Sequence, residues 1–109
     1  MCIFCKIVEK QIPSKLILED ENFYAFEDIN PQAPIHALII PKVHVESFNQ
    51  LTPNIMGPMT TFIQEVALQL GVKNDGYRLI TNIGKNGGQE VGHIHFHLLA
   101  GTQLGRLVP

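Results

Sequence analysis

Hydrophobic positions along the chain change their spacing from one segment to the next, and these changes predict a series of helices and strands. Apolar side chains recur at helical spacing in residues 2–9, which predicts a short first helix. Segments 16–18 and 23–26, separated by an acidic stretch, are typical of a β-hairpin. Residues 36–40 form an apolar run between two prolines, which predicts a strand that is covered on both faces.

A longer helix is predicted in the middle of the chain, where apolar residues recur every three or four positions as far as Leu70. Thr52 or Asn54 can cap its start, and Gly71 is suited to end it. Gly57-Pro58 is expected to begin this helix or to kink it, because proline has no backbone N–H.

Two further strands are predicted at 77–82 and 93–99, on either side of a polar, glycine-rich loop at 83–92. The helices are grouped and do not alternate strictly with the strands. This order predicts an α+β fold with a five-stranded, mainly antiparallel sheet and two helices.

Composition narrows the class of protein. The 109 residues are 45% hydrophobic and 17% charged, which fits one domain over 1–109. A formal net charge of -2 argues against a nucleic-acid partner, and no apolar run approaches the ~20 residues that span a membrane. Cys2 and Cys5 are too close in sequence for a disulfide between them to stabilise the fold, so we expect them to be reduced thiols or metal ligands. Reduced cysteines are typical of cytoplasmic proteins, so we expect that location.

The predicted last strand carries the most informative pattern, three histidines at alternate positions: His93, His95 and His97. Alternate side chains of a strand share a face, so the imidazoles project together while the intervening apolar side chains project into the core. Neighbouring histidines are roughly 6.6 Å apart and the outer two roughly 13 Å apart, so one metal ion cannot bind all three. Zinc bound by His93 and His95 alone remains an alternative, as do histidines with a purely structural role.

The loop before these histidines contains Gly84, Gly87, Gly88 and Gly92, so its backbone can present N–H groups to an anion. Alone, such a loop is also typical of a flexible turn. Together with imidazoles that are largely neutral at pH 7, it predicts a phosphorus atom held beside a nitrogen nucleophile. His95 is flanked on both sides and is the expected attacking group.

The segment His93–Leu99 matches the pattern His-φ-His-φ-His-φ-φ, where φ is apolar, and so resembles the histidine triad (HIT) superfamily. The flanking segments resemble its Hint branch of purine nucleoside phosphoramidases, and they are Asp28–Pro34, Leu38–Lys42, Asp75–Ile80 and Gly87–Val91. Gly92 departs from that branch, which often has a bulkier residue there. The Fhit-type dinucleoside polyphosphate hydrolases share the triad without these flanks.

The resemblance implies a covalent reaction that needs no cofactor for catalysis. His95 would attack the α-phosphorus of a purine nucleoside phosphoramidate, expel an amine, and form a nucleotidyl-histidine that water converts to AMP or GMP. The backbone carbonyl of His93 would accept a ring N–H of His95 and fix its tautomer. His97 and His36, on strands that could be neighbours, would contact phosphate oxygens or help to protonate the amine.

The resemblance also implies which residues bind the nucleotide. The expected phosphate ligands are Asn82, Gln89, Val91 and His97; the ribose would meet Asp28 and Ile29; and the base pocket would be walled by Ile3, Phe4, Ile7, Ile12 and Phe26. Ordinary turn polarity and ordinary core packing are the alternative explanations for these residues.

Two assembly features are implied as well. In some bacterial family members, matching residues hold a structural zinc, and here they are Cys2, Cys5, His44 and His93. Free thiols are the alternative. The branch also implies a homodimer with a continuous ten-stranded sheet.

Three other functions remain open at this point. One is the Fhit-type hydrolase, and another is a nucleotide-binding regulatory module with little turnover. The third is a metal-dependent hydrolase that uses His93 and His95, whose activity chelators would abolish.

Overall fold

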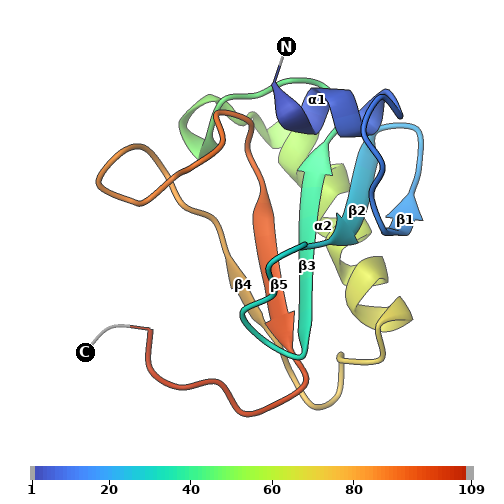
Figure 1. The fold of residues 1–109 in the computed structure, drawn as a ribbon, viewed down its shortest axis with the longest axis vertical. Coiled ribbons are helices and arrows are strands. Elements are labelled where there is room, and N and C mark those ends of the chain that lie inside the picture. The colour runs from blue at the N-terminus through green and yellow to red at the C-terminus, as the bar shows by residue number, and fades with distance from the viewer. Residues whose placement is uncertain (1, 108–109) are drawn as a thin grey trace.

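The computed structural model describes residues 2–107, in which five strands form one antiparallel sheet with a helix on each face (Figure 1). The elements are α1 (Ile3–Val8), β1 (Leu16–Glu19), β2 (Phe23–Glu27), β3 (Ile35–Pro41), a 3-10 helix (Phe48–Gln50), α2 (Pro53–Gln69), β4 (Arg78–Ile80) and β5 (Phe96–Ala100). The predicted α+β fold with a five-stranded antiparallel sheet and two α-helices is confirmed.

The strands lie in the order β1-β2-β3-β5-β4, which places β3 at the centre. In the pairing of β3 with β5, His36 lies opposite Leu99 and Leu38 lies opposite His97. The two histidines therefore come from adjoining strands, although the sequence alone could say only that these strands might be neighbours.

Side-chain alternation divides the core between the two faces of the sheet. On one face, alternate residues of β2, β3 and β5 pack against Met59, Phe62 and Val66 of α2. On the other face, the intervening residues of β2 and β3 pack against Phe4 and Ile7 of α1. Ile94, Phe96 and Leu98 belong to the α2 core, so the triad histidines face the side of α1.

The first helix depends on tertiary contacts, because six residues are far too few for a helix that is stable alone. Cys2 caps it, and its Sγ accepts the backbone N–H of Cys5 at 3.2 Å. Phe4 and Ile7 are its buried residues. In Figure 1, α1 lies across the end of the sheet where β3 finishes.

The second helix begins earlier than Gly57-Pro58. Thr52 is its N-cap and Pro53 its first residue, where a missing N–H costs no helical hydrogen bond. Pro58 lies inside the helix on its exposed side, where water can bind the carbonyl that Pro58 leaves unpaired. Gly71 ends the helix as predicted, with a φ of 73°.

The last strand begins at Phe96 and not at His93. Continuing its register past Phe96 would bring Pro41 opposite Ile94, and proline has no N–H to donate. The backbone N–H of Ile94 donates to Val45 instead, and the Thr81 hydroxyl donates to the carbonyl of His95. The side-chain alternation nevertheless persists through His93 and His95. Strand β4 is likewise shorter than predicted.

Among residues 2–107, no helix is long and apolar enough to cross a membrane.

Candidate active site

His95 is held with one ring nitrogen bound and the other available. Its side chain is buried against Phe4, whose ring centroid lies 5.1 Å away in an edge-on arrangement. Nδ1 lies 2.9 Å from the carbonyl oxygen of His93, as predicted. A carbonyl oxygen can only accept, so Nδ1 carries a proton, and in the neutral form of the ring Nε2 keeps its lone pair.

A second chain of hydrogen bonds fixes the protons of His36 and His97. The backbone N–H of Gln32 donates to His36 Nδ1 at 3.0 Å, so His36 carries its ring proton on Nε2. This Nε2 lies 2.9 Å from His97 Nδ1, which must accept. The ring proton of His97 is therefore on Nε2, and this Nε2–H group can donate a hydrogen bond to an anion.

Burial keeps both rings of this chain neutral at pH 7. Burial, with a smaller effect of the neighbouring His95 and His36, lowers the pKa of His97 to about 4. Burial also lowers the pKa of His36, although Asp28 acts in the opposite direction from 3.5 Å away. Neutral rings are required by the proton positions described above.

A cavity of about 520 Å³ opens beside these histidines, which suits a small ligand. Three of the four predicted catalytic residues line it, namely His36, His95 and His97, and His93 does not. Its other predicted lining residues are Ile3, Phe4, Ile7, Phe26, Asp28, Ile29, Asn82 and Val91. The structure thus gathers residues from α1, β2, β3, β5 and two loops around one cavity.

Ile12 and Gln89 lie outside the wall of this cavity. Ile12 packs against the core beneath α1. The Gln89 amide instead braces the glycine-rich loop: Oε1 accepts the N–H of Gly84 at 3.0 Å, and Nε2 donates to the carbonyls of Glu46 and Val91. Their predicted contacts with base and phosphate remain predictions.

Glycine is required at one point of this loop. A Cβ on Gly87 would lie 2.3 Å from the carbonyl oxygen of Ile83. The backbone N–H groups of Gly88 and Gln89 donate within the loop, and neither Glu90 nor Val91 has a hydrogen-bond acceptor for its N–H among the described residues. The last two are therefore available to a phosphate.

Gly88, in the loop predicted to face an anion, also lines the cavity. Sequence reasoning missed four lining residues: Asn30, Gln32, Leu38 and Glu90. Leu38 could have been found, because it is two residues after His36 in a strand and shares its face. The irregular loops that carry the other three have no periodicity from which side-chain direction can be predicted.

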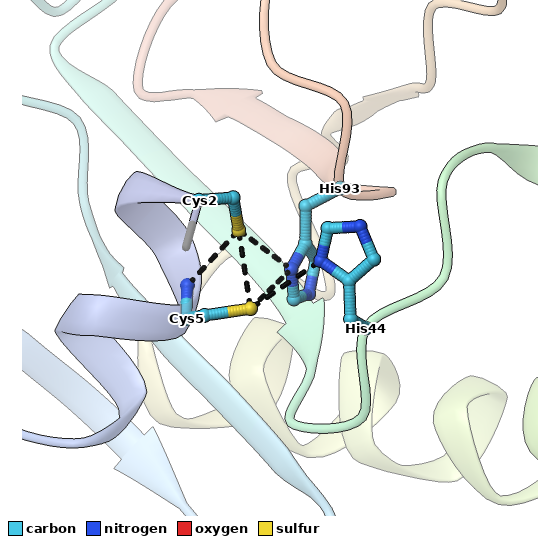
Figure 2. Close-up of side chains that lie close together, drawn as sticks. All are labelled: Cys2, Cys5, His44 and His93. Carbon is cyan, nitrogen blue, oxygen red and sulfur yellow. Dashed lines mark hydrogen bonds between the residues drawn. The ribbon is translucent and has the colours of Figure 1, made fainter.

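Beside the cavity, the four predicted metal ligands converge (Figure 2). The ligand atoms of Cys2, Cys5, His44 and His93 all lie within 4.8 Å of one another. Nδ1 of His93 is 3.3 Å from Cys2 Sγ and 3.5 Å from Cys5 Sγ, and Nδ1 of His44 is 3.3 Å from Cys5 Sγ. A tetrahedral zinc ion separates such ligand atoms by about 3.3–3.8 Å.

The proton positions also fit a cation at this cluster. His93 Nε2 donates to the carbonyl of Pro41 at 2.8 Å, which leaves the lone pair of Nδ1 directed at the sulfur atoms. Burial, with help from Cys2, raises the pKa of the Cys5 thiol to about 11. A bound cation would reverse that effect by stabilising the thiolate.

A metal ion shared by His93 and His95 does not fit the hydrogen bonds. Both ring nitrogens of His93 face partners away from the cavity, and Nδ1 of His95 is bound to a carbonyl. Asp28, His36 and His97 also lie close together. There, a metal on His36 Nε2 would force a proton onto Nδ1, against the N–H of Gln32.

A family model described as the HIT domain matches residues 9–104. The chain belongs to the HIT family. A HIT-like protein of Helicobacter pylori (strain ATCC 700392 / 26695) is 54% identical over 103 residues, which cover 94% of this chain and 99% of that protein.

Two further HIT relatives are similar over nearly their whole length. The purine nucleoside phosphoramidase of Escherichia coli (strain K12) is 45% identical, over 97% of this chain and 92% of that protein. The crystal structure of a HIT family hydrolase from Legionella pneumophila Philadelphia 1 superimposes with a TM-score of 0.91 at 42% identity, covering 96% of each chain.

Proposed function

We propose that this protein hydrolyses purine nucleoside 5′-phosphoramidates to a nucleoside monophosphate and an amine through a nucleotidyl-His95 intermediate. The observation that carries the proposal is the proton arrangement of His95. Its Nδ1–H is bound to the His93 carbonyl, and an unprotonated nitrogen is left on a ring that lines the cavity. That nitrogen can attack phosphorus without a separate base.

The walls of the cavity match the parts of a nucleotide. The apolar side chains of Phe4, Ile7 and Phe26 provide a surface for a purine. Asp28 offers carboxylate oxygens to ribose hydroxyls, and its Oδ1 is held by the N–H of Asn30 at 2.8 Å. The Nε2–H of His97 and the N–H groups of Glu90 and Val91 are donors for phosphate oxygens.

The reaction balances in two steps. His95 Nε2 forms a bond to phosphorus while the P–N bond breaks, and the departing nitrogen takes one proton from solvent water and leaves as an amine. A water molecule then attacks the same phosphorus, the bond to Nε2 breaks, and the attacking water gives one proton back to the solvent. The Nε2–H of His97 stabilises the charge that develops on a phosphate oxygen in both steps.

The HIT relatives favour this reaction over the alternatives, since one of them is named a purine nucleoside phosphoramidase. The direct test is the release of AMP from adenosine 5′-phosphoramidate. We expect steady turnover by the protein, and a loss of at least about a thousandfold in His95→Ala, since the nucleophile itself is removed. Tight AMP binding without turnover would instead indicate a regulatory nucleotide-binding module.

We also propose that Cys2, Cys5, His44 and His93 hold a structural zinc ion. Four protein ligands would leave no open position on the metal, so it would stabilise the fold and take no part in the chemistry. It would tie α1, which carries Phe4, to the backbone that positions His95. One zinc per chain by elemental analysis, lost in Cys5→Ser, is the expected result; a zinc-free protein of equal stability would contradict it.

For assembly, we propose a homodimer that joins two sheets through β4. Strand β4 lies at the sheet edge, where its outer backbone groups have no strand to pair with among the described residues. Leu79 and Tyr77 are exposed beside this edge. Light scattering should give twice the chain mass, and Leu79→Glu should lower it. We expect a cytoplasmic location, in which Cys2 and Cys5 stay reduced.

A further inference from the structure

The charges on the cavity wall are unusual for a site that receives a phosphate. Among the described residues, no lysine or arginine lines it, and the two charged side chains that do are the carboxylates of Asp28 and Glu90. His36 and His97 do not offset them, because burial keeps both neutral at pH 7. The wall is therefore negative, and an anionic ligand is bound by neutral donors alone.

The two carboxylates serve different parts of the cavity. Asp28 is engaged, since it accepts the N–H of Asn30 and lies 3.5 Å from His36. Glu90 lies in the glycine-rich loop, and no described residue donates a hydrogen bond to its side chain or forms an ion pair with it. Glu90 is therefore an exposed carboxylate on the cavity wall that has no partner among residues 2–107.

The position of Glu90 follows from the geometry of substitution at phosphorus. With Nε2 of His95 as the attacking atom, the leaving group departs on the opposite side of the phosphorus. In the proposed complex the base faces the apolar wall of α1 and β2, and the ribose lies beside Asp28, whose loop also carries the lining residues Asn30 and Gln32. The other loop in the wall carries Asn82, Gly88 and Glu90, and we place the leaving group against this segment.

We propose that Glu90 selects the leaving group by charge, favouring phosphoramidates of amines that carry a second, cationic group and disfavouring anionic leaving groups such as polyphosphates. The inference rests on the proposed phosphoramidase function and specifies its substrate class. A carboxylate several ångströms from a unit charge at a partly exposed site changes the rate by about three- to tenfold, with opposite sign for cation and anion.

The test uses three adenosine 5′-phosphoramidates whose amines match in size and end in an ammonium, a neutral amide or a carboxylate. The wild-type kcat/KM should fall in that order. Glu90→Gln should reduce the ratio of kcat/KM for the cationic substrate to kcat/KM for the anionic substrate about tenfold or more, because the loss of attraction and the loss of repulsion combine. Glu90→Lys should reverse the order.

Glu46→Gln is the matched control, because Glu46 is an exposed carboxylate near the same loop that does not line the cavity. In Glu46→Gln, the ratio of kcat/KM for the cationic substrate to kcat/KM for the anionic substrate should equal that of the wild type. An unchanged ratio in Glu90→Gln, or an equal change in Glu46→Gln, would overturn the inference while the proposed function stands. If the wild type cleaves none of the three substrates, the proposed function fails and this inference fails with it.

Discussion

At the scale of single residues, the site works by ordering protons on neutral rings. The carbonyl of His93 fixes His95, and the backbone N–H of Gln32 fixes His36, which in turn fixes His97. Backbone groups cannot change their donor or acceptor character, so they set each tautomer without adding charge. The result is one free lone pair and one N–H donor in a single cavity.

His36 is thus predicted to act through His97. In His36→Leu, nothing holds the ring proton of His97 on Nε2, so the ring can carry it on Nδ1 and present an unprotonated Nε2 to the phosphate. We therefore expect kcat to fall about 10- to 100-fold while KM changes little. His36→Gln keeps an N–H near the original Nε2 and should recover part of the loss. Steady-state kinetics of the two variants check this; equal defects, or a defect confined to KM, would contradict the proton-ordering role.

At the scale of elements, the glycine-rich loop carries the proposed phosphate site as a preformed unit. Gln89 binds both ends of the loop and the carbonyl of Glu46, so the loop is braced before any ligand arrives. The chain passes so close to Ile83 at Gly87 that no side chain fits there. Its backbone donors are therefore positioned by packing and do not depend on the ligand.

A pair of alanine substitutions tests whether the loop needs the close backbone approach at Gly87 or only the flexibility of its glycines. Gly87→Ala places a Cβ 2.3 Å from the Ile83 carbonyl, so the loop must shift and kcat/KM should fall at least about tenfold. Gly92→Ala meets no atom within 4 Å and should remain near wild type. The comparison is made by kinetics and by AMP titration; similar effects of both substitutions would argue against a preformed cradle.

Hydrophobic spacing was sufficient to predict the helices and the strand positions, because the helices bury one face and the central strands bury both. Hydrophobic spacing did not predict strand ends where the backbone hydrogen bonds are made to partners outside the sheet. Thr81 and Val45 replace the strand ladder around His93–His95, and no local pattern reveals such partners. The directions of Gln89 and Glu90 were equally hidden, because they depend on how an irregular loop folds back on itself.

At the scale of the whole molecule, the buried histidines couple stability to pH. The pKa of native His97 is about 4, and the pKa of native His36 is also lowered, against about 6.5 in an unfolded chain. Between pH 6.5 and 4, His36 and His97 bind protons in the unfolded chain but stay largely neutral in the native protein. Stability must therefore fall as pH decreases through this window, and these rings have no effect above it.

The contribution of His97 can be measured by difference. Urea unfolding of the wild type and of His97→Gln should diverge between pH 7 and pH 4, with the wild type losing on the order of 3 kcal/mol more, because the variant lacks this ring. The carboxylates and the cluster of Cys2, Cys5, His44 and His93 are common to both proteins, so their contributions to the pH dependence cancel. Parallel stability profiles would contradict the low pKa of His97.

The central claim is a covalent bond between His95 and phosphorus, and rapid-quench mass spectrometry with adenosine 5′-phosphoramidate tests it most directly. Quenching must avoid acid, which cleaves P–N bonds. We predict that the wild-type chain gains the mass of one adenylyl group, that this group maps to His95, and that His95→Ala gains none. Turnover without an adduct, or an unchanged rate in His95→Ala, would contradict the account.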